Sequence, residues 1–500
     1  MRKNVGRSMI ASVSFLLALA SLLRADEVMD RIEVLGLLAS GAPSAMVAAS
    51  AGRSGIAFKP DKAFLAVLSE GDADEMLLNA LRHASRVKIK ADRSSAASEE
   101  TTVEHLASVA RLTKQKQFPE AERESRAAMT LFPRRAVLRE VLGYVLQEQG
   151  KLDDAIVVYR ETTRLNPRRP RTHDLLAMAL QTKGDLDGAI EEYRAALRLR
   201  PQSALMHNSL GVALAQKGKL DDAVTELRNA IRLAPDFAAA HFNFGNALYR
   251  KGDWEGAIAR YRAVQRIDPA FPGLRNNLGA ALLNEGDVAA AMQELRATVK
   301  DNPGEANAHL NLANALLRQG AKEEAISEYR EAVSLKPDDA GYHQDLGNLL
   351  AQVGKPDEAI TEFRAAERLT PTDAQVHYSL GVLLAQQDKL DEAIDEYRAA
   401  IRANPNHAPS HHNLGVILSQ QGWLDEAVDE LRIAVRLDPP NALGHRNLGR
   451  LLYEEGNETA ALGELQTACK LAPNDPQVCD AYRELLKKSH ETDDADEADQ

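Results

Sequence analysis

The chain has 500 residues, of which 5% are aromatic and 27% charged, and its formal net charge at pH 7 is −12. This length exceeds what one conventional hydrophobic core holds, so we expect several domains or a repeat architecture. The prevalence of Ala, Leu, Glu and Arg favours helices over strands. The acidic balance argues against nucleic acid as a partner, and the 44% apolar content excludes wholesale disorder.

Residues 1–25 have the pattern of an export signal peptide. Arg2, Lys3 and Arg7 precede an uncharged apolar stretch from Met9 to Leu23, and small residues follow. The stretch is shorter than the roughly 20 residues that a membrane span needs. We therefore expect cleavage rather than anchoring, and a mature chain without a stable membrane span that is exported to the periplasm or secreted.

Residues 26–89 are predicted to form a small helical N-terminal domain. Four segments have helical patterns, separated by turns that contain glycine or proline. These candidate helices are 27–39, 44–53, 61–70 and 72–86. Residues 90–101 are polar and rich in serine and alanine, which predicts a linker.

A 34-residue period runs through residues 102–475. Eleven prolines share this spacing: Pro133, Pro167, Pro201, Pro235, Pro269, Pro303, Pro337, Pro371, Pro405, Pro439 and Pro473. With this proline at position 32 of the unit, eleven repeats begin at Thr102. A period of this length indicates stacked supersecondary units, each of which buries its apolar face against its neighbours.

Each repeat is predicted to be a pair of helices, helix A at about positions 2–14 and helix B at about positions 17–30. In repeats two to eleven, position 11 is always Leu, position 20 is always Ala and position 8 is Gly or Ala. The small residues lie where two helices must approach closely. Position 15, between the helices, is Gly in nine of these repeats and Asp388 in the other, which fits the left-handed conformation of a helix-ending turn.

The repeat resembles the tetratricopeptide repeat (TPR). One unit carries the pattern at positions 7, 8, 11, 20, 24, 27 and 32: Leu414, Gly415, Leu418, Ala427, Leu431, Ala434 and Pro439. Segments such as 411–415 and 424–427 are similar to the repeats that precede the catalytic region of O-linked GlcNAc transferases, but no catalytic domain follows here. The resemblance covers 374 of the 500 residues. It implies an all-α solenoid, a right-handed superhelix in which A helices line a concave groove that receives peptide.

The ends of the array depart from the pattern. The first repeat keeps little beyond Leu112, Ala121, Ala128 and Pro133, as expected of a terminal cap. Short helical segments like those predicted before residue 90 also precede TPR arrays in some bacterial proteins. Residues 476–488 are predicted to form a capping helix and residues 489–500 an acidic, disordered tail. Cys469 and Cys479, the only cysteines, either form a disulfide in an oxidising compartment or remain two buried thiols.

Asparagines on one face of helix A are the candidate binding residues. The TPR resemblance places position 6 in the groove, and position 9 lies one turn later on the same face. An amide there can pair with the backbone of any peptide, because it both donates and accepts hydrogen bonds. The candidates are Asn243, Asn246, Asn277, Asn311, Asn314, Asn348, Asn413 and Asn447. We expect Asn243, Asn277 and Asn311 to face solvent in the free protein; the alternative is a solvated face without a ligand.

Histidine and arginine also recur. Nine histidines occupy position 4, where the TPR pattern usually has Trp. We interpret them as half-buried packing residues, because helices about 8–10 Å apart cannot share one metal ion; His407, His411 and His412 are the better metal candidates. Arginine at position 25 is expected to pair with acids of its own helix, as Arg398 with Asp395, with an anion-binding stripe as the alternative.

The sequence contains no catalytic motif, and we expect no enzyme activity, no cofactor and no bound metal. The favoured function is an exported protein-interaction module that binds extended peptide segments of a partner protein. One alternative is a scaffold of an envelope complex that uses its outer surface. Another is a non-catalytic, substrate-selecting partner of a separate glycosyltransferase. The oligomeric state stays open.

Overall fold

The computed structural model describes residues 30–40, 44, 47–48, 51, 56–60, 62–70, 73–84 and 96–498. The predicted export signal and most of the candidate helix 44–53 lie outside these residues. The regular elements of the described part are helices, α2 and α4 to α28. Within that part, no helix combines the length and the apolar character that crossing a bilayer requires. The chain forms two compact units, residues 1–285 and 286–500.

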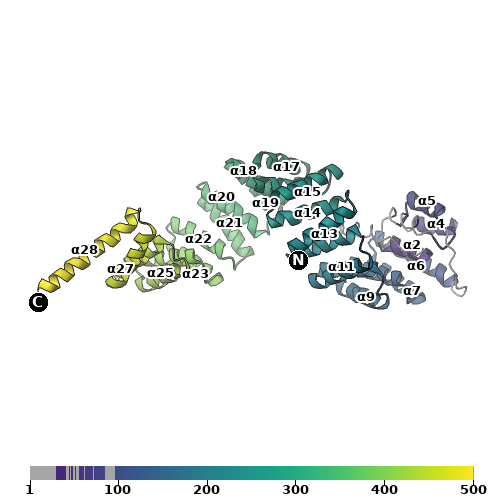
Figure 1. Cartoon of the computed structure of the whole chain (residues 1–500), viewed down its shortest axis with the longest axis horizontal. Coiled ribbons are helices and arrows are strands. Elements are labelled where there is room, and N and C mark those ends of the chain that lie inside the picture. Colours follow the sequence, from purple (N-terminus) through teal and green to yellow (C-terminus); the bar gives the residue numbers. More distant parts are fainter. Residues whose placement is uncertain are drawn as a thin grey trace. The chain divides into compact units, whose positions relative to one another are not determined.

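In the first unit, three short helices precede a series of helix pairs (Figure 1). The short helices are α2 (Arg31–Ala39), α4 (Lys62–Glu70) and α5 (Glu75–His83). The pairs are α6 (Ala96–Lys114) and α7 (Phe118–Leu131), α8 (Ala136–Glu148) and α9 (Leu152–Leu165), α10 (Pro170–Lys183) and α11 (Leu186–Leu199), α12 (Ala204–Gln216) and α13 (Leu220–Leu233), and α14 (Ala238–Lys251) and α15 (Trp254–Ile267), followed by α16 (Leu274–Glu285).

The second unit starts with helix B of the sixth repeat and continues the pattern (Figure 1). It contains α17 (Val288–Asp301), the pairs α18 (Ala306–Gln319) and α19 (Lys322–Leu335), α20 (Ala340–Gln352) and α21 (Pro356–Leu369), α22 (Ala374–Gln386) and α23 (Leu390–Ala403), α24 (Ala408–Gln420) and α25 (Leu424–Leu437), α26 (Ala442–Glu454) and α27 (Glu458–Leu471), and finally α28 (Pro476–Ala498). The predicted all-α fold with 34-residue helix pairs is confirmed.

Small residues at position 8 let helices A and B approach closely. A Cβ added at Gly245 would lie 2.5 Å from a ring carbon of Tyr261, which occupies position 24 of the same repeat. Gly381 and Tyr397 repeat this relationship in the second unit, with a distance of 2.7 Å. The missing methyl group at position 8 therefore makes room for a large buried side chain from helix B.

Position 15 ends helix A with a left-handed residue, as predicted. Gly184 and Gly320 have φ of 94° and 87°, and Asp388 adopts the same conformation with φ of 61°. Lys116, the residue at position 15 of the divergent first repeat, also has a positive φ of 58°. The turn therefore survives in the first repeat although its glycine is lost.

Several neighbouring A helices contact one another within a unit, as α12 with α14 and α24 with α26. No comparable contact joins successive B helices among the described residues. The A helices therefore lie closer together than the B helices, on the inner side of each stack. We call the surface formed by positions 5, 6 and 9 of successive A helices the A-helix face.

Two predicted boundaries were wrong. Helix α6 begins at Ala96, so the second half of the predicted linker is helical. Helix α28 continues to Ala498, where a disordered tail was predicted from residue 489. Neither proline nor glycine occurs between Gln477 and Ala498, so nothing in the sequence stops the capping helix at Lys488.

Candidate functional site

Four asparagines link three consecutive A helices of the first unit. Asn243 on α14 donates through Nδ2 to Oδ1 of Asn208 on α12, at 2.9 Å. Asn277 on α16 donates in the same way to Oδ1 of Asn246 on α14, also at 2.9 Å. Asn208 was not among the predicted residues, because it occupies position 5; the recurrence of Asn at position 5 in Asn276 was the available signal. The amides therefore form a chain along the A-helix face rather than a row of separate groups.

Tyrosines from helix B hold several of these amides in place. The hydroxyl of Tyr261 donates to Oδ1 of Asn246 at 2.7 Å, and that of Tyr329 donates to Oδ1 of Asn314 at 2.6 Å. In the second unit, Asn413 Nδ2 donates to the hydroxyl of Tyr397 at 3.3 Å. Burial raises the pKa of the Tyr261 and Tyr329 phenols, so both remain protonated donors.

The expectation that Asn243, Asn277 and Asn311 face solvent was wrong, because all three are half-buried. Among the other candidates Asn348 is exposed, and the remaining four are half-buried: Asn246, Asn314, Asn413 and Asn447. Oδ1 of Asn447 accepts a 3.3 Å hydrogen bond from Arg446. Helical spacing shows which side of a helix a residue occupies, but it does not show how closely the next A helix covers it.

The A-helix face carries few charges. Positions 5, 6 and 9 of α12, α14 and α16 hold only uncharged side chains, although 27% of the chain is charged. In α18, α20, α22 and α24 the same positions hold one acid, Asp345. Burial raises the pKa of its carboxyl, and the charge of Asp339 adds to the shift. On α26 these positions include Arg446 and Arg450. From α12 to α24 the face therefore offers hydrogen bonds and little electrostatic attraction.

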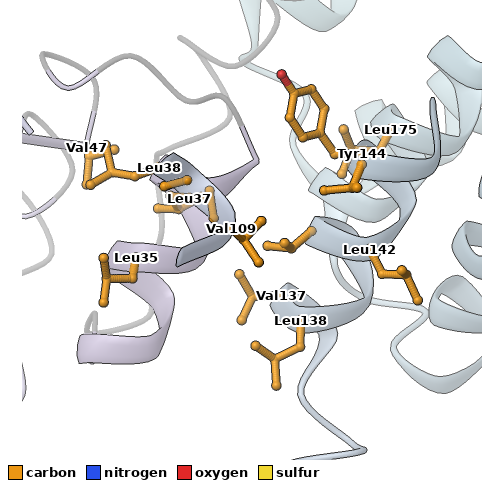
Figure 2. Packing of buried hydrophobic residues seen from close by; sticks show 14 of the residues in the cluster. Leu35, Leu37, Leu38, Val47, Val109, Val137, Leu138, Leu142, Tyr144 and Leu175 are labelled. Atoms are coloured by element: carbon orange, nitrogen blue, oxygen red, sulfur yellow. The ribbon is translucent and has the colours of Figure 1, made fainter. Parts of the chain in front are cut away.

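Helix α2 covers the first part of the A-helix face. It packs against α6 and α8, and Figure 2 shows its Leu37 beside Val109. Seven of its nine residues are buried. A Cβ on Gly36 would overlap the side chain of Val137, so only glycine permits this close approach. The chain itself thus occupies the face at the first two repeats.

A buried ionic cluster fastens α2 to the third repeat. Glu140 accepts from Arg169 Nε at 2.8 Å and from the Thr172 hydroxyl at 2.6 Å. Arg169 also bonds Glu33 on α2, at 2.7 Å, and Arg171 donates to the hydroxyl of Ser40 at 2.5 Å. Although burial opposes ionisation, the two arginines hold the pKa of Glu140 at about 2. The A-helix face is therefore open only from α12 onward in the first unit.

Comparison with known families supports the repeat pattern found in the sequence. Models described as tetratricopeptide repeats match residues 142–165, 179–218, 213–252, 245–286, 276–340, 345–408 and 412–476. Together these matches cover more than half of the chain. The chain belongs to the TPR family.

Several solved structures match part of this TPR array at low sequence identity. MamA 41-end from Desulfovibrio magneticus RS-1 has 24% identity and a TM-score of 0.31, and the match covers 34% of this chain and 96% of that one. YrrB, titled a TPR protein with an unusual peptide-binding site, has 24% identity, a TM-score of 0.34, and coverage of 38% and 97%. The human IFIT1 dimer with PPP-AAAA has 17% identity, a TM-score of 0.42, and coverage of 75% and 91%. No curated protein matches the chain.

The histidines at position 4 of the TPR units lie between helices A and B, as the packing interpretation predicted. In eight repeats Nδ1 lies 2.5–2.7 Å from a carboxylate oxygen of Glu at position 23: His105–Glu124, His173–Glu192, His207–Glu226, His309–Glu328, His343–Glu362, His377–Glu396, His411–Glu430 and His445–Glu464. We call these contacts the His–Glu dyads. The glutamates were missed, although their constant 19-residue separation from the histidines was visible in the sequence.

The structure does not assemble His407, His411 and His412 into a metal site. Nδ1 of His411 contacts Glu430, that of His407 contacts the Ser410 hydroxyl at 2.7 Å, and that of His412 has no hydrogen-bond partner in the described part. Within that part, one group has ligand atoms close enough for a cation: Glu367, His377 and Glu396. The guanidinium of Arg364 already bonds both of these carboxylates and supplies the positive charge.

Arginine at position 25 pairs mainly with the next repeat, so the predicted pairing within the helix is wrong for Arg398. Its guanidinium lies 3.0 Å from Glu426, which is at position 19 of the following repeat. Arg296 and Glu324 make the same contact at 3.4 Å. Arg432 lies 3.8 Å from Asp429 in its own helix, and Arg364 and Arg126 also pair with glutamates of their own helices. These exposed pairs stabilise the packing of helices only slightly.

Proposed function

We propose that this TPR protein is an exported, non-catalytic adaptor that binds an extended segment of a partner protein along its A-helix face. The chain of amides on α12, α14 and α16 carries the proposal. Each carboxamide has two N–H donors and an oxygen with two lone pairs. The bonds from Asn243 to Asn208 and from Asn277 to Asn246 each use one donor and one lone pair. Asn243, Asn246 and Asn277 therefore retain N–H donors for a peptide backbone, whereas Asn208 is buried.

The internal hydrogen bonds favour binding because they orient the amides before a ligand arrives. Asn246 receives hydrogen bonds from both Tyr261 and Asn277, so its side chain is fixed by two different helices. A side chain that is already ordered loses less conformational entropy when it binds. The half-buried position of these asparagines is thus compatible with a binding role.

The scarcity of charge on the A-helix face favours recognition of the peptide backbone over recognition of charged side chains. Asparagine can pair with the N–H and C=O groups that every peptide carries. We therefore expect the adaptor to bind many unrelated extended sequences with similar affinity. Its affinity should also depend little on salt, because screening weakens only interactions between charges.

Export is a further part of the proposal. The basic and apolar pattern of residues 1–25 supports it. The disulfide between Cys469 and Cys479 is also suited to an oxidising compartment. N-terminal sequencing of the mature protein should find a start near Ser21 or Asp26; an intact Met1 on soluble cytoplasmic protein would exclude export.

A direct test uses an array of peptides of unrelated sequence, each about 12 residues long. At ~3.3 Å per residue such a peptide spans about 40 Å, enough to cross about four A helices spaced by ~10 Å. We expect the full chain to bind many of these peptides, with less than about a threefold change between ~0.1 M and ~1 M salt. Binding only to charged peptides, and only at low salt, would contradict recognition of the backbone.

A further inference from the structure

Seven of the position-4 histidines have both ring nitrogens directed at hydrogen-bond acceptors. Besides the Nδ1 contact with glutamate, their Nε2 atoms lie 3.0–3.1 Å from the backbone carbonyl of the proline six residues earlier. These residues are His173, His207, His309, His343, His377, His411 and His445. The proline belongs to the preceding repeat, so each such dyad joins helix A, helix B and the previous turn.

A neutral histidine and an ionised glutamate have one N–H proton between them, but the two contacts of each histidine need two protons. This geometry therefore requires one additional proton. A neutral imidazole donates from one nitrogen only. If Nε2–H donates to the proline carbonyl, the lone pair of Nδ1 faces a carboxylate oxygen, and two acceptors repel one another. A proton on Nδ1 or on the glutamate turns the contact into a strong hydrogen bond. The contact lengths of 2.5–2.7 Å fit such a bond.

A metal ion in place of the proton does not fit these contacts. Zinc lies about 2.0 Å from nitrogen and oxygen ligands in tetrahedral geometry, which separates the two ligand atoms by roughly 3.3 Å. His207 Nδ1 and Glu226 Oε2 are 2.6 Å apart. The dyads are therefore proton sites.

His241 is a natural control inside the array. It occupies position 4 of its repeat, and its Nε2 contacts the carbonyl of Pro235 at 2.9 Å. Position 23 of the same repeat is Arg260 instead of glutamate, and Nδ1 of His241 has no hydrogen-bond partner among the described residues. A neutral imidazole satisfies this arrangement, so His241 needs no additional proton.

The charged groups around the dyads favour the protonated state. For His207 on α12, burial and the charge of Arg232 oppose the positive charge of the imidazolium. The hydrogen bond with Glu226 on α13 outweighs them, so the pKa of the imidazole is raised. His173 and His411 have raised pKa values for the same reason, with Arg198 and Arg436 as the opposing charges.

His377 on α22 has the most acidic surroundings. Glu396 on α23 lies 2.7 Å from its Nδ1, and Glu367 on α21 lies 4.0 Å away, with Arg364 between the two carboxylates. Burial of the imidazole opposes the charge, but these acids raise its pKa.

We propose that the TPR array is stabilised by bound protons, with one proton in each of the seven dyads linking helix A, helix B and the preceding turn. A histidine whose pKa is raised on folding stabilises the fold fully below its unfolded pKa of about 6.5, and this contribution is lost as the pH rises through the folded value. The repeats therefore pack most firmly in mildly acidic solution and loosen above neutrality. This inference does not depend on the identity of the partner or on peptide binding.

The test compares urea unfolding of the full chain at about pH 6 and about pH 8.5, on either side of the ordinary histidine pKa of about 6.5. The variant carries Glu192→Gln, Glu226→Gln and Glu430→Gln. A glutamine amide can donate to Nδ1 while Nε2–H still donates to the proline carbonyl, so these three repeats no longer need a proton. We expect the wild-type midpoint to fall at the higher pH, and the fall to be smaller in the variant by about three sevenths. Glu294→Gln is the matched control, because its repeat has Arg275 at position 4.

Nitrogen NMR of labelled histidine rings provides the second measurement, which does not depend on unfolding. At about pH 7.5, above the ordinary pKa, we expect the rings of His173, His207, His377 and His411 to carry a proton shared at Nδ1. Absence of that proton from these four rings, or equal midpoint shifts in the wild type and the triple variant, would overturn the proposal.

Discussion

The hydroxyl of Tyr261 donates a 2.7 Å hydrogen bond to Oδ1 of Asn246. The tyrosine is buried between helices A and B, and the asparagine lies on the A-helix face. A side chain of the repeat core therefore positions a side chain of the proposed binding surface. Tyr329 and Asn314 repeat the arrangement in the second unit at 2.6 Å. Packing within a repeat and binding along the A-helix face are in this way coupled.

Replacing Tyr261 by Phe tests this coupling. The variant keeps the packed ring and loses one hydrogen bond, so we expect stability to fall by about 0.5–1.5 kcal/mol. Peptide affinity should fall by up to about tenfold, because Asn246 loses one of its two fixing bonds. The measurements are urea unfolding and binding to the peptide array. Tyr159→Phe is the control: Tyr159 shares position 24, but its hydroxyl has no hydrogen-bond partner among the described residues, so neither stability nor affinity should fall.

Replacing Gly245 by Ala tests the close approach of helices A and B. The new Cβ would meet three ring atoms of Tyr261 at 2.5–3.0 Å, so the ring or the helix must shift. We expect a loss of about 1–3 kcal/mol in chemical unfolding. Gly463→Ala is the matched control, because a Cβ there meets nothing within 4 Å. It should stabilise its helix by about 0.5–1 kcal/mol. Equal effects at both glycines would contradict the packing argument.

Two leucines at position 11 test how stability is distributed. Leu316 is buried in a central repeat, so Leu316→Ala should lower stability by about 2–5 kcal/mol. Leu112 in the divergent first repeat is only half-buried, and Leu112→Ala should cost about 1–2 kcal/mol. Denaturant unfolding of both variants measures the difference. Equal losses would show that the first repeat contributes as much as a central one.

The cysteine pair tests the end of the array. Cys469 on α27 and Cys479 on α28 are joined, so thiol labelling of unfolded, unreduced protein should find no free thiol. Reduction should destabilise the packing of α28 on α27 by about 2–3 kcal/mol, the value for closing a loop of this length. Hydrogen exchange in α28 before and after reduction reports the change. Two labelled thiols would mean that the cysteines are not bonded in the protein.

The repeat period made most of the fold predictable, because each TPR contacts mainly its neighbours and every neighbour has the same sequence pattern. The repeat position of Gly245 predicted a close approach of two helices, and that of Asp388 predicted a left-handed turn. The period does not describe contacts outside the pattern. Arg169 and Glu33 are 136 residues apart in the sequence and meet at 2.7 Å, and no local signal shows that α2 covers the A helices of the first repeats.

The candidate site was predictable in position but not in detail. The spacing of Asn243 and Asn277 predicted a shared helix face. It did not show that Asn208 and Asn246 would accept their hydrogen bonds, because such contacts depend on how closely successive A helices pack. The glutamate partners of the histidines were missed for a different reason. Glu226 was not among the predicted residues, although the 19-residue separation that it keeps from His207 recurs in most repeats.

The central claim, that amides of the A-helix face bind a peptide backbone, is tested most directly by replacing Asn243, Asn246 and Asn277 by Ala together. Each amide bond to a peptide should contribute roughly 0.5–1.5 kcal/mol, so binding to the peptide array should weaken by about 10- to 1,000-fold. Because Asn243 and Asn277 also bond neighbouring helices, thermal melting of the variant must be measured at the same time.

The matched control replaces Thr225, Gln293 and Ser327 by Ala. These exposed polar side chains share position 22 on helix B, on the other side of the repeat. Peptide affinity measured for both triple variants and the wild type, at a temperature where all three remain folded, decides the question. We predict a large loss for the asparagine variant and none for the control. Unchanged affinity in the asparagine variant would contradict the account and would move the binding surface to the outer, helix B side.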